Sequence, residues 1–340
     1  MNVAQRSASV TGIGAATGYF TLDRWNITPS GTAGRLTMTQ TADGPTGFAN
    51  CIKLDCTTAD TSIAAGEYLV LHQNFEGQDL QAIGKGVVGA KETTISFYVK
   101  ANAAFTFGVE LVDNDNSRQI TKLFATTTGW VRHEFVIPAD VDDGSSPFDD
   151  DVGSSLSLYF WLHAGATYTS GTLNTASWAN QTNANRLAGI DSFYSSTDNN
   201  FFITGVQMEV GSVATPFEHR SFGEELALCQ RYCQARIGSE GSNDTNSQLG
   251  YGNARSATAA FFQDRLQVKM RAPPSLTVVN ANQFYIYQTS AIATTALALD
   301  ISDVNTMMLV ATVAGGLTAP TFHTLGANNA NAQVIYSAEL

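Results

Sequence analysis

Aromatic side chains at alternate positions of one predicted strand are the residues of this sequence best suited to chemistry. In the run SLSLYFWLHA (155–164), Tyr159, Trp161 and His163 are each separated by one apolar residue. Side chains two residues apart on a strand point to the same face, so the leucines and Phe160 take the opposite face. A leucine-rich face is expected in the core. The aromatic face is then available to form the floor of a site that stacks on sugar rings.

Loop residues after this strand could complete such a site. Sugar rings present apolar C–H patches on their faces and hydroxyl groups around their edges. The additional rings are Tyr168, Trp178 and Tyr194, and the amide partners are Asn174, Asn180 and Gln181. We predict that the ligand-binding residues are Tyr159, Trp161, His163, Tyr168 and Trp178. A second interpretation is that this face packs against a neighbouring subunit or loop, because aromatic side chains also anchor interfaces.

A cluster of acidic residues before this strand suggests a second kind of site. The aspartates are Asp140, Asp142, Asp143, Asp149, Asp150 and Asp151. Their carboxylates are the ligands that a hard cation such as Ca²⁺ prefers, although the spacing lacks the pattern of a calcium-binding EF-hand loop. A solvated turn is the simpler interpretation, so a structural Ca²⁺ is an alternative here and no other cofactor is predicted.

The sequence favours a protein without catalytic activity. None of its five histidines belongs to a recognised catalytic or metal-binding motif, although His219 has a carboxylate, Glu218, beside it. A glycosidase needs only two carboxylates at about 5–9 Å, so glycan cleavage stays as a less favoured alternative. The long internal repeats typical of a β-helix are also missing.

The strands that must position these residues occupy the first two thirds of the chain. Between Arg35 and Val210, nine short segments with strand character are separated by turn-forming runs such as DNDNS (113–117). Many strands without intervening helices predict a mainly β protein with a jelly-roll-like β-sandwich over residues 1–220.

The last third predicts a linker and a second domain. Glu224, Glu225 and a stripe of apolar residues predict a helix over 222–238. We therefore predict a linking helix and loop over 221–245 and a smaller C-terminal β-sandwich over 246–340. After Arg271 the only charged residues are Asp300, Asp303 and Glu339. So little charge predicts that this domain buries much of its surface against identical copies.

Composition excludes several classes of partner. The chain has 340 residues with 18 Lys and Arg against 30 Asp and Glu, a net charge of −12, and no basic cluster. Nucleic acid is therefore not an expected partner. No run of 18 apolar residues occurs, so we expect no membrane insertion. The first residues, MNVAQRSASVTG, do not follow the signal-peptide pattern, so we expect synthesis in a cytosol.

One block of sequence resembles a known family. The segment FFITGVQMEVGSVATPFEHRSFGEELALCQRYCQ (201–234) is similar to a pattern usual in phage tail-fibre proteins that carry a carbohydrate-binding-module-like β-sandwich. Other similar segments are NVAQR (2–6), TLDRW (21–25), AGEYLVLHQNFEGQDL (65–80), TTISFYVKA (93–101), WVRHEFVIP (130–138), KMRAPPSLTV (269–278) and YSAEL (336–340). Cys233 departs from the pattern, because an aromatic residue is usual there.

This resemblance implies a function that composition and spacing do not. It implies a structural protein of the virion, a tail fibre or similar surface appendage, which binds host-surface glycan for attachment without catalysis. It also implies a homotrimer, contacts with other phage virion or tail proteins, and assembly in the host cytoplasm. The alternatives are a purely structural capsid decoration or tail adaptor protein and, third, a glycan-degrading tailspike.

Overall fold

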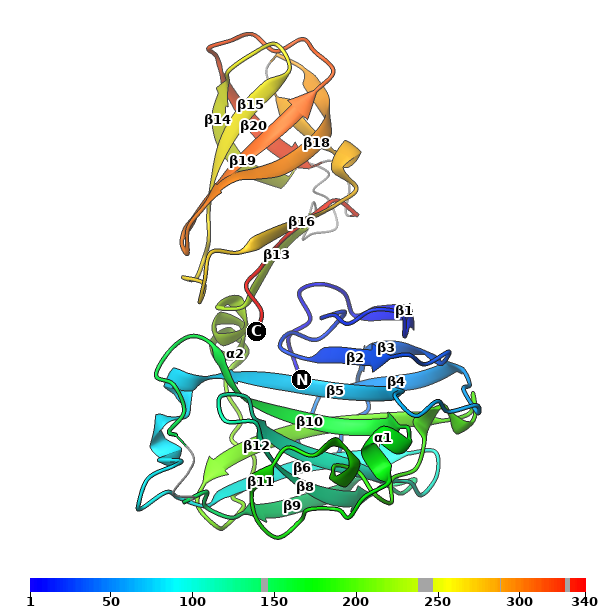
Figure 1. Ribbon diagram of the computed structural model, residues 1–340. Helices are drawn as coiled ribbons and strands as arrows, with labels where there is room; N and C mark the ends of the chain where they lie inside the picture. The colour runs from blue at the N-terminus through cyan, green and yellow to red at the C-terminus, as the bar shows by residue number, and fades with distance from the viewer. Residues whose placement is uncertain (142–145, 238–246, 288, 328–330) are drawn as a thin grey trace. The chain divides into compact units, whose positions relative to one another are not determined.

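The chain folds into two compact units of antiparallel strands (Figure 1). The computed structural model describes residues 1–141, 146–237, 247–287, 289–327 and 331–340. The first unit comprises residues 1–222 with Leu340, and the second comprises residues 223–339. The prediction of a mainly β protein is confirmed. No helix in the described residues is long and apolar enough to cross a bilayer.

Two six-stranded sheets form the first unit. The first sheet has the order β1 (Ser9–Ile13), β3 (Arg35–Thr41), β4 (Cys51–Thr58), β12 (Asn200–Val210), β6 (Thr93–Ala101) and β9 (Val131–Ile137). The second sheet has the order β11 (Ala179–Asn180), β8 (Arg118–Ala125), β7 (Thr106–Asp113), β10 (Ser154–Ala164), β5 (Tyr68–Glu76) and β2 (Asn26–Ser30). One apolar core draws side chains from both sheets, so the predicted N-terminal β-sandwich is confirmed.

The core follows from the alternation of apolar residues along the strands. Leu158 and Phe160 of β10 are fully buried, as predicted, and so is Phe97 of β6 in the other sheet. The rings of Phe97 and Phe160 meet edge to face with their centroids 5.0 Å apart, which joins the two sheets. Burying one such side chain contributes about 1.5–3 kcal/mol. The opposite side chains of β10 are thereby directed to the outer face of the second sheet.

Short helical turns lie in the connections around the sandwich. The turns η1 (Gly77–Asp79) and η2 (Gln81–Ile83) follow β5. After β10 come α1 (Ala166–Thr169), η3 (Asn183–Asn185) and η4 (Phe193–Ser195). Helix α1 contacts both β10 and η3, so the long connection between β10 and β12 folds back over the second sheet.

The helix predicted over 222–238 is shorter than expected. Helix α2 (Phe222–Gln230) ends eight residues early, and β13 (Cys233–Ile237) follows it. Strand β13 pairs with β21 (Gln333–Ser337), about 100 residues later in the chain, with Cys233 opposite Ser337. This long-range ladder outweighs the local helical preference of the sequence. The predicted linking loop falls largely on residues 238–246, which lie outside the described residues.

The second unit contains a closed barrel in place of the expected second sandwich. Its barrel has the order β14 (Ser247–Ala254), β15 (Ala259–Arg265), β19 (Thr306–Val313), β18 (Ala291–Ser302), β17 (Phe284–Tyr287) and β20 (Phe322–Ala327). A three-stranded sheet, with the order β13, β21 and β16 (Ser275–Val279), completes the unit. Closure of the barrel pairs every strand on both sides, so no strand edge is exposed. The alternation of residues along a strand does not indicate whether a sheet closes in this way.

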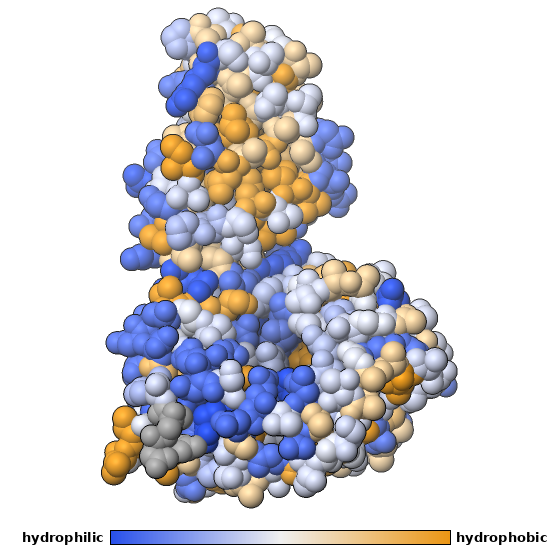
Figure 2. Space-filling view, viewed as in Figure 1, coloured by the Kyte–Doolittle hydropathy of each residue, from blue (hydrophilic) through white to orange (hydrophobic). Residues whose placement is uncertain are grey.

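Apolar side chains also gather on the outside of the barrel, as Figure 2 shows. Tyr251 and Phe322 are 57% and 66% exposed and stack on each other with their ring centroids 5.9 Å apart. Ile301 of β18 is 65% exposed, and Met308 of β19 is half-buried. The low charge of this part of the sequence therefore coincides with apolar side chains on its surface.

Candidate functional site

A groove lies on the outer face of the second sheet of the first unit. Its volume is about 340 Å³. Strands β2, β5, β7 and β10 supply its floor, and helix α1 with the loops 114–117 and 181–186 supplies its walls. The lining residues are Thr28, Tyr68, Val70, His72, Val112, Asp113, Asn114, Ser117, Tyr159, Trp161, Tyr168, Gln181, Asn183 and Arg186.

The register of the strands arranges the floor in two rows. The first row is Thr28, Val70, Trp161 and Gly108, and the second is Asn26, His72, Tyr159 and Glu110. Directly opposed residues of antiparallel strands point to the same face, so each row runs across β2, β5, β10 and β7. The site therefore depends on pairings between strands that are distant in the sequence.

Gly108 in the first row makes room for the loop that closes the groove. A Cβ atom at this position would lie only 2.5 Å from Cδ2 of Leu187. Leu187 is fully buried and packs with Val70 and Trp161 in a small apolar cluster on the outer face of the sheet. A larger residue at position 108 would therefore force Leu187, the neighbour of Arg186 in the chain, to move.

Glu110 holds two other groove residues in place from beneath. Its Oε2 atom accepts hydrogen bonds from Nε1 of Trp161 and from Nη2 of Arg186, both at 2.7 Å. Nε of Arg186 also donates to Oε1 at 2.9 Å, so the ion pair is bidentate. The Cζ atom of Arg186 lies 4.6 Å from the centroid of the Trp161 ring, as in a cation–π contact. Burial raises the pKa of Glu110, and the charge of Arg186 opposes that shift.

Three half-buried tyrosines form the accessible aromatic surface of the groove. They are Tyr68, Tyr159 and Tyr168. Tyr68 and Tyr168 meet edge to face at 5.4 Å, and each lies 5.5 Å from Trp161 between ring centroids. Trp161 itself is only 2% exposed. The structure thus brings Tyr159, Trp161 and Tyr168 together at one groove, where Trp161 supports the tyrosines and is not an open stacking platform.

His72 is a neutral member of the groove floor. It is 8% exposed, and its Nε2 atom lies 3.0 Å from Oγ1 of Thr28. Its ring meets Tyr159 edge to face with centroids 5.0 Å apart. Burial lowers the pKa of His72 to about 4, so the imidazole carries no charge at neutral pH. His72 can therefore position Thr28 and Tyr159 without adding charge to the site.

His163 does not lie in the groove, contrary to the prediction. A β-bulge shifts the register between Trp161 and His163, so that His163 lies opposite Leu69. Leu69 points into the core, and His163 consequently does so too. His163 is fully buried, with Nδ1 2.8 Å from Oγ of Ser192 and Nε2 3.6 Å from Oε2 of Glu67. Burial lowers the pKa of His163.

Trp178 also lies away from the groove. Its Nε1 atom donates a hydrogen bond to the carbonyl oxygen of Pro138 at 3.0 Å, and its ring packs against the core of the first unit. It lines a separate small cavity that also involves Lys85 and Asp140. Trp178 lies in a loop, where the alternation of a strand does not apply, so its closeness to β10 in the sequence does not predict which way its side chain points.

The other predicted partners are divided between the groove and its surroundings. Gln181 lines the groove. Asn174 instead donates hydrogen bonds to the carbonyl oxygens of Gln119 and Ser177. Tyr194 is fully buried in the core, and Asn180 is exposed on β11 without lining the groove.

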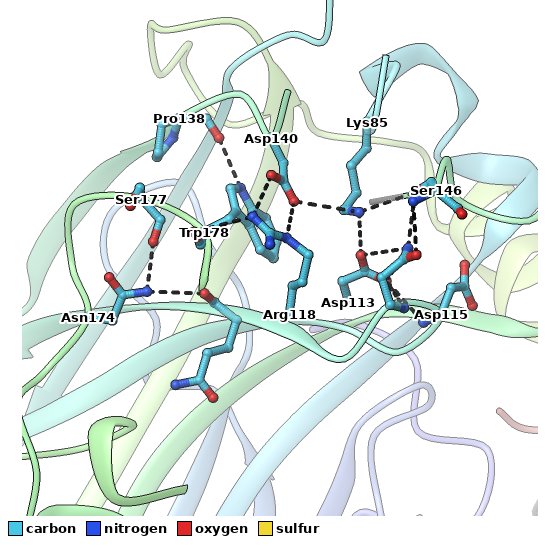
Figure 3. Close-up of polar contacts among 12 residues, drawn as sticks. Lys85, Asp113, Asp115, Arg118, Pro138, Asp140, Ser146, Asn174, Ser177 and Trp178 are labelled. Carbon is cyan, nitrogen blue, oxygen red and sulfur yellow. Dashed lines mark hydrogen bonds and ion pairs between the residues drawn. The ribbon is translucent and has the colours of Figure 1, made fainter. Parts of the chain in front are cut away.

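The acidic loop is organised by basic side chains (Figure 3). Asp140 accepts hydrogen bonds from Nε and Nη2 of Arg118, both at 2.8 Å. Nζ of Lys85 lies 2.5 Å from Oδ2 of Asp113 and 3.5 Å from Oδ2 of Asp140. All four side chains are at most 9% exposed, so two cations neutralise two carboxylates in a nearly dry environment.

This arrangement leaves little room for the Ca²⁺ interpretation. Asp140 is already paired, and Asp149, Asp150 and Asp151 are exposed. Asp142 and Asp143 lie outside the described residues. Among the residues that are described, no group of three or more His, Cys, Asp or Glu side chains could hold a metal ion. The described part of the loop therefore has the character of a paired and solvated turn.

Several groove residues were missed by the sequence reasoning. Tyr68, Val70 and His72 alternate with leucines in EYLVLHQNF (67–75), the same signal that identified β10. Arg186 shows no such pattern, because its role depends on Glu110, 76 residues earlier in the chain.

Comparison with known proteins finds similarity only at the level of solved structures. No family model matches the chain, and no curated protein does. The enzymatically active domain of tailspike protein 4 of bacteriophage CBA120 is similar with a TM-score of 0.30 and 11% identity, over 55% of this chain and 19% of that one. The chain thus spans about a fifth of that protein.

Carbohydrate-binding modules are among the other similar structures. The family 11 module of the cellulosomal cellulase Lic26A-Cel5E of Clostridium thermocellum has a TM-score of 0.29 and 14% identity, over 59% of this chain and 99% of that one. The CBM22-1 xylan-binding domain of Xyn10C from Paenibacillus barcinonensis has a TM-score of 0.27 and 16% identity, over 55% and 87%. Similarities this distant do not identify a ligand, which has to be inferred from the groove itself.

Proposed function

We propose that this protein binds a glycan in the groove on the second sheet and does so without catalysis. The observation that carries the proposal is the set of three half-buried tyrosines, Tyr68, Tyr159 and Tyr168, around a floor held rigid by Glu110 and Arg186. Rings held at the wall of a groove can stack on the apolar faces of sugars, and their hydroxyl groups stay available for hydrogen bonds.

The rim of the groove supplies partners for sugar hydroxyls. Asn114, Ser117, Gln181 and Asn183 are exposed and line the groove. Their amide and hydroxyl groups can both donate and accept hydrogen bonds, as sugar hydroxyls do. One stacked ring is worth about 1 kcal/mol, so we expect an affinity near millimolar for each site. Binding to a surface would then depend on several copies acting together.

The state of the carboxylates at the groove supports a non-catalytic role. A glycosidase needs one carboxyl group as an acid and another as a base or nucleophile, both accessible to the substrate. Glu110 is fully buried and accepts hydrogen bonds from Trp161 and Arg186. Asp113 is fully buried and paired with Lys85. Both carboxylates are therefore buried and paired, whereas glycoside hydrolysis requires carboxyl groups that are accessible to the substrate.

We further propose that the protein is part of a phage virion, in a tail fibre or similar appendage used for attachment to the host. The similarity of residues 201–234 to the tail-fibre pattern supports this proposal. The charge-poor segment 272–340 and the apolar barrel surface support a homotrimer in contact with other virion proteins. Such a protein would be assembled in the host cytoplasm and act on the virion. A capsid decoration or tail adaptor protein is the alternative, with the aromatic groove then serving as an interface.

A binding experiment with variants of the groove tests the proposal. Tyr68 and Tyr168 are replaced together by alanine, and migration of the full chain is measured in gels containing neutral polysaccharides. The wild type should be retarded by at least one polysaccharide, and the double variant at least tenfold less. Tyr98→Ala is the control, because this tyrosine is also half-buried but lies on β6 of the first sheet, outside the groove. Equal retardation of the wild type and the double variant would refute the assignment of the groove.

A further inference from the structure

The groove contains charged side chains but has no net charge. Of the residues described as lining it, Arg186 and Asp113 take part in ion pairs. Nη2 of Arg186 lies 2.7 Å from Oε2 of Glu110, and Oδ2 of Asp113 lies 2.5 Å from Nζ of Lys85. Each charge is therefore cancelled by a buried partner.

The hydrogen-bonding capacity of Arg186 is only partly used by Glu110. Nε and Nη2 donate to the carboxylate, whereas Nη1 donates to none of the residues that the structure describes. A guanidinium group has five N–H donors, so some remain for a ligand. Its position over the Trp161 ring, 4.6 Å from the centroid, keeps these donors in a fixed orientation at the groove.

The remaining donors suit a hydroxyl oxygen better than a carboxylate. A sugar hydroxyl accepts a hydrogen bond without bringing a charge. A sugar carboxylate would place a second negative charge beside a guanidinium group that Glu110 already neutralises, and the two like charges would repel in a poorly solvated site. The chain as a whole also carries a net charge of −12, which disfavours the approach of an acidic polymer.

From these contacts we infer that the groove selects uncharged glycans over acidic ones, and that Glu110 determines this selectivity by cancelling the charge of Arg186. The inference rests on the proposed function. It assigns Glu110 a role beyond holding Trp161 and Arg186 in position, because a purely positioning residue would not change the preference between neutral and acidic ligands.

The first test uses polysaccharides in matched charged and uncharged forms. Alginate, polygalacturonate and hyaluronan are compared with the same polymers after chemical reduction of their carboxyl groups, together with neutral glucans, galactans and xylans. The wild-type chain should bind neutral or reduced forms at least tenfold more tightly than carboxylated forms. Equal or tighter binding of the carboxylated forms would overturn the inference and leave the proposed function standing. Failure to bind any polymer would overturn the proposed function and this inference with it.

The second test changes the charge of the floor. Glu110→Gln keeps the size of the side chain but leaves the charge of Arg186 uncompensated. Affinity for carboxylated forms should rise about tenfold relative to neutral forms, and added salt should weaken the new binding. Glu218→Gln removes the same charge from an exposed position outside the groove and should leave the ratio unchanged. An unchanged ratio in folded Glu110→Gln protein would overturn the role of Glu110.

A surface variant keeps the inference testable if Glu110→Gln does not fold. Gln181 is exposed at the rim, so Gln181→Lys adds one positive charge to the groove without disturbing the buried ion pair. We expect its preference to shift about tenfold towards carboxylated polymers. If Gln181→Lys binds neutral polymers normally but shows no shift, charge at the groove does not control selectivity.

Discussion

Replacement of Trp161 by alanine should destabilise the first unit, and this result distinguishes the structure from the expectation based on sequence. An open stacking residue can be removed at little cost to the fold. Trp161 is instead 2% exposed, contacts Tyr68 and Tyr168, and donates a hydrogen bond to the buried carboxylate of Glu110 at 2.7 Å. Its loss would open a cavity beneath the tyrosines and leave Glu110 with one donor fewer.

The expected size of the effect follows from these contacts. Truncation of a buried tryptophan to alanine costs about 3–5 kcal/mol of unfolding free energy. Trp161→Phe retains most of the packing but removes the donor to Glu110, so it should cost about 1–3 kcal/mol. Tyr168→Ala, at a half-buried position, should reduce glycan binding and cost less stability than Trp161→Ala.

Urea denaturation followed by tryptophan fluorescence measures these differences. All four tryptophans, Trp25, Trp130, Trp161 and Trp178, lie in the first unit, so the signal reports its unfolding, and three probes remain in each Trp161 variant. A loss below about 1 kcal/mol for Trp161→Ala, together with abolished glycan binding, would refute the supporting role assigned to this residue. It would favour the open stacking platform predicted from the sequence.

Three further predictions concern pH, the ion-pair cluster and assembly. Burial lowers the pKa of His72 to about 4 in the folded protein, whereas in the unfolded chain it is about 6.5. As the pH falls below about 6.5, His72 is therefore protonated in the unfolded chain before it is protonated in the folded protein. His72 should therefore lower the unfolding free energy by about 3 kcal/mol between pH 6.5 and pH 4, and His72→Gln should flatten the urea-denaturation profile by that amount. Lys85→Met should cost about 3–5 kcal/mol in the same assay, because it removes the ammonium group between the buried carboxylates of Asp113 and Asp140; an unchanged midpoint would contradict this. Light scattering should give the mass of a trimer for the wild type and a smaller mass for Met308→Asp on the barrel, whereas a stable wild-type monomer would rule out the trimer.

The sandwich could be predicted because its strands carry their orientation in local alternation. Leu158 and Phe160 face the core, and Tyr159 and Trp161 face the opposite side, as the period of two requires. His163 marks the limit of this reasoning. A bulge before it reverses the alternation, and nothing in the local residue types identifies the bulge.

Features that depend on long-range pairing could not be predicted. Residues 233–237 belong to a strand because β21 is available as a partner, although the preceding residues are helical. The closure of the barrel likewise follows from the pairing of β14 with β20. Alternation reports which face of a strand is buried, but it does not report which strands meet.

The groove also combines residues that local spacing predicts with residues that only long-range contacts bring together. The aromatic residues of β10 were predictable from their spacing, whereas the buried ion pair joins Glu110 of β7 to Arg186 in a loop. Lys85 similarly meets Asp113 and Asp140 only after folding. Isolated charged residues resemble solvated surface residues in a sequence, so their burial and pairing appear only in the structure.

Hydrogen–deuterium exchange with a bound oligosaccharide tests the central claim most directly, because it locates the ligand on the chain. The full-length protein is saturated with an oligosaccharide of a polymer that retards it in gels, and peptide exchange is compared with and without the ligand. Protection should concentrate on residues 68–72, 159–168 and 181–186, which contribute to the groove. Protection confined to the first sheet or to the barrel of the second unit, with these segments unchanged, would contradict the assignment of the glycan site.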